Sequence, residues 1–156
     1  MKRIFSSFVA CAALVLYATN TQALTLPPPL VHESIERGWV RWLPANLPAA
    51  GYATIRNDGD KAVKLTGVDS TDYGMTMLHR SMQKDGKDTM EMMGEIGIPA
   101  HGQVKLAPGG YHLMLMNPKH SIKPGDSVHL SLHFNNGETL YAIWLVRPAN
   151  ATGPND

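Results

Sequence analysis

The stretch GMTMLHRSMQKDGKDTMEMM, residues 74–93, predicts a β-hairpin from which the rest of the fold can be worked out. Two β-like runs flank Asp85-Gly86, a dipeptide that favours a two-residue hairpin turn. With these residues in the turn, Lys84 faces Lys87, and this fixes the register of the whole hairpin. A slip of one residue would move every side chain of one strand to the opposite face, so the register decides which side chains meet.

The register also predicts which side chains share a face with His79. Counting back from the turn sets Ser81 opposite Met90. It sets His79 opposite Met92. Because His79 and Ser81 are two residues apart, they lie on the same face of the strand. His79 and Met90 are therefore diagonal neighbours on one surface, within reach of long side chains.

Short runs of β-forming residues continue on both sides of the hairpin, separated by turn signals such as Asn136-Gly137. No window beyond the N-terminal segment shows a helical period. The predicted strands cover residues 38–42, 50–56, 62–68, 74–82, 89–96, 104–106, 111–116, 128–134 and 140–146. About eight or nine short strands at regular spacing indicate an all-β fold, a Greek-key antiparallel β-sandwich or barrel.

The N-terminal segment of this 156-residue chain is typical of a secretion signal. Basic residues precede an apolar run that is too short to span a membrane comfortably, and small residues up to Ala23 offer a cleavage site. We expect residues 1–23 to be a cleaved signal peptide, the alternative being an uncleaved anchor. Residues 24–156 are then a single domain with a polar, loosely ordered tail over residues 148–156. Cys11 faintly resembles a lipoprotein cleavage position, but it comes too early in the apolar run, and we assign it to the signal peptide.

Composition after cleavage excludes several function classes. Cleavage removes Cys11, the only cysteine, so the mature domain has no disulfide and no thiolate ligand. It also removes two of the 14 basic residues, which leaves 12 against 13 acidic residues and a formal charge of −1. A near-neutral surface without a basic run argues against nucleic acid or an anionic membrane as partner, and we expect no stable membrane insertion.

Possible metal ligands are concentrated in one part of the chain. Every methionine except the initiator lies within residues 75–116, together with His79 and His112. His112 and Met114 are two residues apart on a predicted strand, so they point to one face with Cα atoms roughly 6.5–7 Å apart. Leu113 points to the opposite face, which is the predicted core side.

Two imidazoles and two thioethers from three strands therefore make a compact set of four ligands: His79, Met90, His112 and Met114. Thioether sulfur is soft and uncharged, and it binds Cu(I) well but Zn(II), Mg(II) or Ca(II) poorly. The set contains no carboxylate, so a bound Cu(I) keeps its positive charge. We predict one Cu(I) per chain, in a surface site suited to giving its ion away.

The other methionines and histidines have simpler interpretations. Met92 and Met116 are alternative ligands, and His120 is a candidate for the border of the site. Met75 and Met77 share a strand face with His79, which leaves lining of the site as an alternative, but we favour packing or contact with a partner for both. Met82 and Met93 are assigned to packing or to the surface. We expect His129 and His133 to face solvent. No role is assigned to His32 or His101, and the tryptophans predicted at the core or its edge are Trp39, Trp42 and Trp144.

The spacing H-x10-M-x21-H-x-M, formed here by His79, Met90, His112 and Met114, resembles the signature of the PCu(A)C family of periplasmic copper chaperones. Further segments that are similar to that family are residues 39–41, 50–52, 98–100, 108–112 and 123–126. The resemblance extends from about Trp39 to Val146.

This resemblance implies a cupredoxin-like or immunoglobulin-like β-sandwich that binds one Cu(I) through those four residues. It implies a periplasmic chaperone, not an enzyme, that delivers copper for cytochrome c oxidase assembly. The implied partners are a copper-accepting oxidase subunit and a thioredoxin-like copper protein of the Sco type; we expect a monomer. Some members carry a His- and Met-rich C-terminal extension, and residues 148–156 contain neither residue, so a second site favouring Cu(II) is not expected there.

Other functions compete with this one. A periplasmic copper buffer or tolerance protein is the nearest alternative. An electron-transfer cupredoxin needs a cysteine thiolate with two histidines, and the predicted mature chain has no cysteine. One class of copper oxidases and monooxygenases uses an N-terminal histidine, whereas the predicted mature chain begins at Leu24. A purely structural sandwich domain predicts that replacing both His79 and His112 leaves copper binding unchanged.

Overall fold

The computed structural model describes residues 31–45, 47–84 and 86–156, and within these ranges the regular elements are all strands. The predicted signal peptide, residues 1–23, lies outside the described residues. In the described part of the chain, no helix has the length and apolar character needed to cross a bilayer. The strands are β1 (Glu33–Arg41), β2 (Ala49–Asn57), β3 (Val63–Ser70), β4 (Tyr73–Lys84), β5 (Lys87–Met93), β6 (Ile96–Ile98), β7 (Gly102–Leu106), β8 (Tyr111–Pro118), β9 (Ser127–Phe134) and β10 (Thr139–Arg147).

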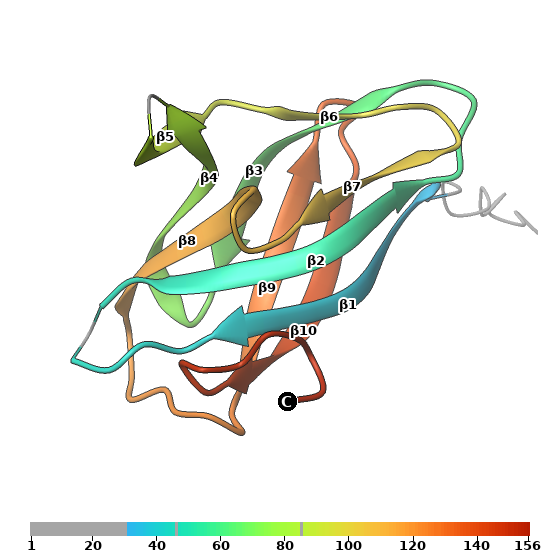
Figure 1. Ribbon diagram of the computed structural model, residues 1–156. Helices are drawn as coiled ribbons and strands as arrows, with labels where there is room; N and C mark the ends of the chain where they lie inside the picture. Colours follow the sequence, from blue (N-terminus) through green and yellow to red (C-terminus); the bar gives the residue numbers. More distant parts are fainter. Residues whose placement is uncertain (1–30, 46, 85) are drawn as a thin grey trace, which may run out of the picture.

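The strands hydrogen-bond in the continuous order β5-β4-β8-β7-β2-β1-β10-β9-β3-β6, with an added pairing of β8 to β2. The sheet folds over on itself, so that β1, β2, β7 and β8 form a layer in front of β3, β9 and β10 (Figure 1). The predicted all-β sandwich is therefore confirmed.

Two of the pairings among the described residues are parallel, which the prediction of an antiparallel fold did not include. β1 and β10 run in the same direction over residues 39–41 and 145–147. β7 and β8 meet in parallel at Leu106 and Tyr111. Alternation of apolar residues along a strand shows which face is buried but not the direction of the neighbouring strand, so the sequence did not reveal these pairings.

Buried and partly exposed side chains alternate along the middle of β8, and this distinguishes the core side of the front layer from its outer face. Leu113 and Leu115 are fully buried, whereas Met114 and Met116 stay partly exposed. The opposite layer supplies its own inward side chains, such as Leu132 of β9. The even-numbered residues of β8 therefore lie on the outer face, as the sequence predicted.

The seam between β1 and β10 depends on a close approach of Gly38 to Trp144. β1 contains a bulge between Glu36 and Trp39, and within it Arg37 has a φ of 55°. A Cβ atom placed on Gly38 would lie 2.6 Å from Cε2 of Trp144, whose side chain is almost fully buried. This position therefore has no room for a side chain unless the indole moves.

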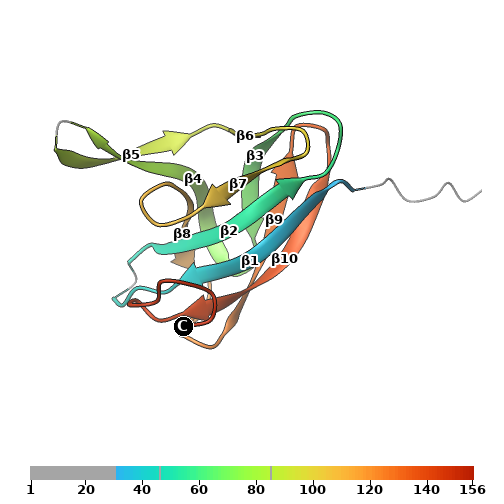
Figure 2. The ribbon, with the colours of Figure 1, turned by 45° about the vertical axis from the view of Figure 1, so that its right-hand side comes forward.

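β4 and β5 form the predicted hairpin in the predicted register. Lys84 pairs with Lys87 beside the turn, and His79 pairs with Met92 further along. The end of the hairpin projects from the body of the sandwich (Figure 2). β5 is exposed over nearly its whole length. The hairpin is thus a ladder whose outer strand has little contact with the core.

Residues 148–156, which were expected to be loosely ordered, instead turn back onto the outer face of the front layer (Figure 1). Ala151 is buried in a small apolar cluster with Trp39 and Tyr52. The Asp156 carboxylate accepts hydrogen bonds from two backbone N–H groups and one hydroxyl of the same segment. One buried alanine and a capped turn leave no pattern in the sequence, which explains why the prediction differs from the structure.

Candidate metal centre

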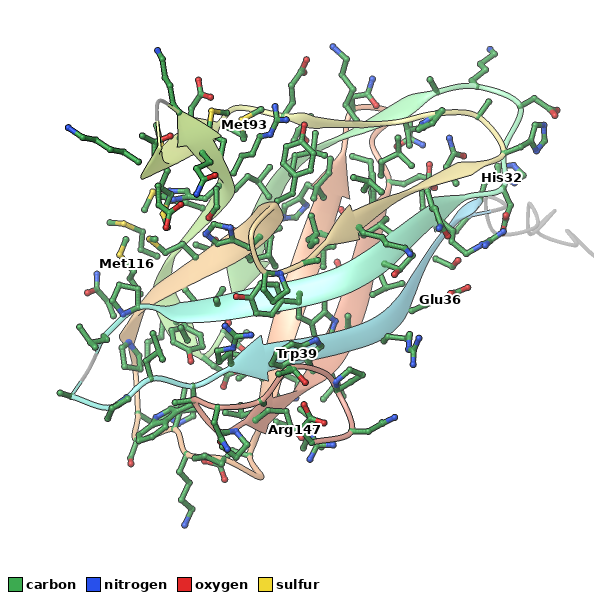
Figure 3. All side chains as sticks on the ribbon, in the orientation of Figure 1. His32, Glu36, Trp39, Met93, Met116 and Arg147 are labelled. Carbon is green, nitrogen blue, oxygen red and sulfur yellow. The ribbon has the colours of Figure 1, made fainter. Side chains whose placement is uncertain are left out.

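A row of side chains crosses the outer face of the front layer and continues onto β4 and β5, which extend the sheet beyond β8. His79 of β4 lies opposite Met92 of β5 on one side and opposite His112 of β8 on the other. The row continues through Tyr52 of β2, whose ring centroid is 6.5 Å from that of His112, to Trp39 of β1 at 4.8 Å from Tyr52. In Figure 3 the yellow sulfur atoms gather on the left of the molecule, over β4, β5 and β8.

His79 and His112 face each other with ring centroids 5.8 Å apart. Both ring nitrogens of His79 are buried and have no hydrogen-bond partner in the described structure. Buried polar atoms are normally paired, so the unpaired nitrogens of this ring indicate a position where a ligand would bind. Burial, together with the neighbouring His112, lowers the pKa of His79 from its ordinary value of 6.5. The ring is therefore neutral at pH 7 and offers a lone pair to a metal.

His112 is oriented by the backbone. Its Nδ1 lies 3.1 Å from the carbonyl oxygen of Gly110. Since a carbonyl only accepts, Nδ1–H is the donor, and the lone pair of the neutral ring is on Nε2. A hydrogen bond of this kind fixes both the tautomer and the orientation of a metal-binding histidine.

Met114 joins the histidines on the same face. It follows His112 by two residues on β8 and pairs with Met77 on β4. On its other side it pairs with Ala50 of β2. Met114 is only partly buried, so its thioether is accessible on the face that carries the histidines.

Met90 reaches this face from the hairpin. It pairs with Ser81, two residues along β5 from Met92, which pairs with His79. Met90 therefore lies on the same face as His79 and diagonal to it, as the hairpin register predicted. Met90 is 53% exposed and Met92 is 68% exposed. The structure thus places both methionines, the predicted ligand and its alternative, on the exposed strand beside His79.

The donors available at this place are neutral. Among residues 31–45, 47–84 and 86–156, no three His, Cys, Asp or Glu side chains gather closely enough to hold a metal ion. An ion at His79 and His112 would therefore take its further protein ligands from methionine. That combination of donors suits a soft monovalent ion and does not suit hard divalent ions.

The rings of Trp39 and Tyr52 border the site and form an aromatic wall that the sequence did not predict. Trp39, predicted at the core or its edge, is buried and lies in the outer cluster with Tyr52. The Arg41 guanidinium carbon lies 5.4 Å from the ring centroid of Trp39 and 5.1 Å from that of Tyr52. Burial raises the pKa of Tyr52, with Arg41 opposing that rise. Tyr52 thus lies beside His112 on the side of β2, and His112 itself is only 6% exposed.

The remaining histidines lie elsewhere. His120, the candidate for the border of the site, instead contacts the carboxylate of Asp72 at 2.9 Å. His129 contacts the same carboxylate at 3.1 Å, and both rings are more than half exposed. Trp144 is buried in the core, and the partly buried residues packed against the core include Trp42 and Met93, as predicted.

Comparison with known proteins identifies related sequences. A family model described as LpqE-like matches residues 34–142. A relative from Leifsonia xyli subsp. xyli (strain CTCB07), named as the putative lipoprotein Lxx21020, is 31% identical over 106 residues, which is 67% of this chain. The chain spans 63% of the length of that relative.

Several solved structures share the fold. The copper-bound PCuAC domain from PmoF2 has a TM-score of 0.64 at 24% identity, covering 76% of this chain and 94% of that chain. The solution structure of CuI-DR1885 from Deinococcus radiodurans has a TM-score of 0.61 at 29% identity, with 86% and 85% covered. The apo form of DR1885 has a TM-score of 0.57 at 27% identity, with 98% and 99% covered. Of the two predicted sandwich types, the cupredoxin-like one is therefore confirmed.

Proposed function

Because this chain belongs to the LpqE-like family and has the fold of the PCuAC copper-chaperone domain, we propose that it is an exported copper chaperone that binds one Cu(I) and passes it to a partner. In this proposal the ligands are His79, Met90, His112 and Met114. The protein acts as a carrier, with no enzymatic step.

The observation that carries the proposal is the histidine pair, His79 and His112. The first ring has two buried nitrogens without partners, and the second has its lone pair placed by the Gly110 carbonyl. Methionines flank the pair on the same face, and the described part of the chain places no carboxylate cluster there. CuI-DR1885, whose name states its Cu(I) form, has the same fold at 29% identity.

Transfer of the ion would use the difference in exposure among these ligands. His112 is buried, whereas Met90 lies on the exposed strand of the projecting hairpin. A partner's ligand can therefore replace Met90 while the histidines still hold the ion, and the remaining ligands follow one at a time. This sequence of exchanges needs no change in oxidation state.

For location and destination, we propose the periplasm and the assembly of cytochrome c oxidase. The N-terminal segment typical of secretion and the lipoprotein name of the Leifsonia relative support export. A copper-accepting oxidase subunit and a Sco-type thioredoxin-like protein are the proposed partners of a monomeric carrier.

The main test is Cu(I) affinity, measured by competition with a Cu(I) chelator. Replacing Met90 or Met114 by Ile should keep the fold and weaken binding sharply, because each change removes a sulfur ligand. Met82→Ile is the matched control, since Met82 lies on the opposite face of β4 from His79 and should leave the affinity unchanged. X-ray absorption should show mixed sulfur and nitrogen scatterers. Unchanged affinity in both ligand variants, or a spectrum with nitrogen and oxygen only, would refute the ligand set.

A copper buffer that protects against excess metal is the second candidate, because a transferable site on an exposed face serves storage equally well. A deletion strain separates the two. A chaperone predicts loss of oxidase activity in limiting copper, restored by the wild-type chain but not by His79→Ala. A buffer predicts normal oxidase activity and greater sensitivity to added copper.

A further inference from the structure

Facing pairs of methionines lie beside the histidine pair. Met77 faces Met114, and Met75 faces Met116, across the antiparallel ladder of β4 and β8. Residues two apart on a strand share a face, so these side chains lie on the outer face with His79. Met114 belongs to the proposed site. The other members are not among its four proposed ligands, although Met116 was predicted as an alternative one, and we name them the thioether triad: Met75, Met77 and Met116.

The thioether triad is not required to fill the core. Its neighbours Leu78 and Leu115, on the inner face of the same strands, are 4% and 0% exposed and supply the core packing. By contrast, Met75 is 45% exposed, and Met77 and Met116 are only partly buried. Figure 3 shows Met116 at the left edge of the molecule, away from the core. The triad thus presents sulfur to solvent in a group.

We propose that the thioether triad is a second Cu(I) site. Facing residues of an antiparallel ladder have Cα atoms about 4.5–5.5 Å apart, and residues two apart on one strand about 6.5–7 Å. Unbranched, flexible methionine side chains on so small a patch can bring their sulfur atoms to one ion. Three neutral thioethers bind Cu(I) and disfavour the hard divalent ions.

The second site has a defined place relative to the first. Met114 pairs with Met77 of the triad and lies between Met116 and His112 along β8. An ion held by the triad can therefore pass to the histidine pair through Met114 by exchange of one thioether at a time, with no redox step. The triad shares no ligand with the proposed His79, Met90, His112 and Met114 site, so each of the two assignments can be tested and can fail independently.

The experiment is an anaerobic titration of the mature chain with Cu(I) against a competing chelator. The wild-type protein should bind two equivalents. A variant with all three triad methionines changed to Leu should bind one equivalent. A variant with His79→Ala and His112→Ala should retain one equivalent, whose X-ray absorption shows sulfur scatterers alone. The control is the double variant Met82→Leu and Met93→Leu, which removes two methionines that belong to neither site. It should still bind two equivalents of Cu(I).

Equal stoichiometry in the wild-type protein and the triad variant would overturn the second site. So would loss of all Cu(I) binding in the histidine variant, and that result leaves the carrier proposal intact. If only the carrier site were wrongly assigned, the histidine variant would bind the same number of Cu(I) equivalents as the wild type. If the triad variant does not fold, methyl NMR of the unaltered protein decides the matter. The Met75 and Met116 methyl signals must shift with one of the two equivalents, and a titration in which neither shifts overturns the proposal.

Discussion

The ring of His112 shows how much of the candidate site is set by single contacts. It is buried between the His79 ring and the Tyr52 ring, and its Nδ1–H is held by the Gly110 carbonyl. The carbonyl is positioned by a tight turn in which the Gly110 N–H donates to the carbonyl of Ala107 at 3.0 Å. A ligand fixed in this way loses little freedom on binding a metal, which favours affinity.

Tyr52 provides the prediction at this scale. Tyr52→Ala should lower the free energy of unfolding by about 3 kcal/mol or more, because a buried aromatic ring is removed between Trp39 and His112. It should also weaken Cu(I) binding, since His112 loses its neighbour on the side of β2. Urea denaturation and chelator competition measure the two effects.

Tyr52→Phe is the matched control, because it keeps the ring and removes only the hydroxyl. It should stay close to the wild type in Cu(I) affinity. If Tyr52→Ala bound Cu(I) as tightly as Tyr52→Phe, the aromatic wall would have no part in holding His112.

Among the elements, local pairings could be predicted from the sequence and distant ones could not. The β4–β5 register followed from Asp85-Gly86 because a two-residue turn fixes every pair behind it. The common face of His112 and Met114 followed from strand periodicity. The pairing of His79 with His112 joins strands far apart in the sequence, and the wall formed by Tyr52 depends on a further distant pairing, of β2 with β8. Propensity and alternation carry no signal for such pairings.

The seam of β1 and β10 gives the prediction at the scale of elements. Gly38→Ala should destabilise the protein by about 1–3 kcal/mol, because the added methyl group would overlap the buried indole of Trp144. The midpoint of urea unfolding should fall at an unchanged slope. Gly97→Ala in β6 is the control, since a Cβ there meets nothing within 4 Å. Similar midpoints for the two variants would show that the seam can relax.

Across the whole molecule, Asp72 links the β3–β4 turn to the β8–β9 connection and to β9 through its side chain. It lies in the β3–β4 turn, and its carboxylate accepts from His120 in the β8–β9 connection and from the backbone N–H of His129 in β9, the latter at 2.7 Å. Burial alone would raise the pKa of Asp72. The hydrogen bonds from the His129 backbone, the His120 ring and the His129 ring prevail, and they lower the pKa from 3.8 to about 2.

Asp72 therefore predicts a pH dependence of stability. A carboxyl group whose pKa is depressed by folding stabilises the protein above its unfolded value, 3.8, and that contribution is lost as the pH falls toward about 2. The shift corresponds to about 2 kcal/mol at neutral pH. Asp72→Asn should be less stable by roughly this amount at pH 7 and should approach the wild type near the lower end of that range.

Asp60→Asn is the control for this prediction, because the Asp60 side chain is 95% exposed and its loss should change stability by less than about 0.5 kcal/mol at any pH. A constant difference between wild type and Asp72→Asn down to the lowest pH would contradict the assignment. Chemical denaturation over a series of acidic buffers measures both curves.

The described chain begins on the opposite side of the molecule from the methionines of β4, β5 and β8. Figure 3 shows His32, where the described chain enters, at the right edge, and Met116 at the left. A fluorescent label attached at position 32 would therefore lie on the far side of the molecule from Met116 and would leave the sulfur-bearing side open to an approaching protein.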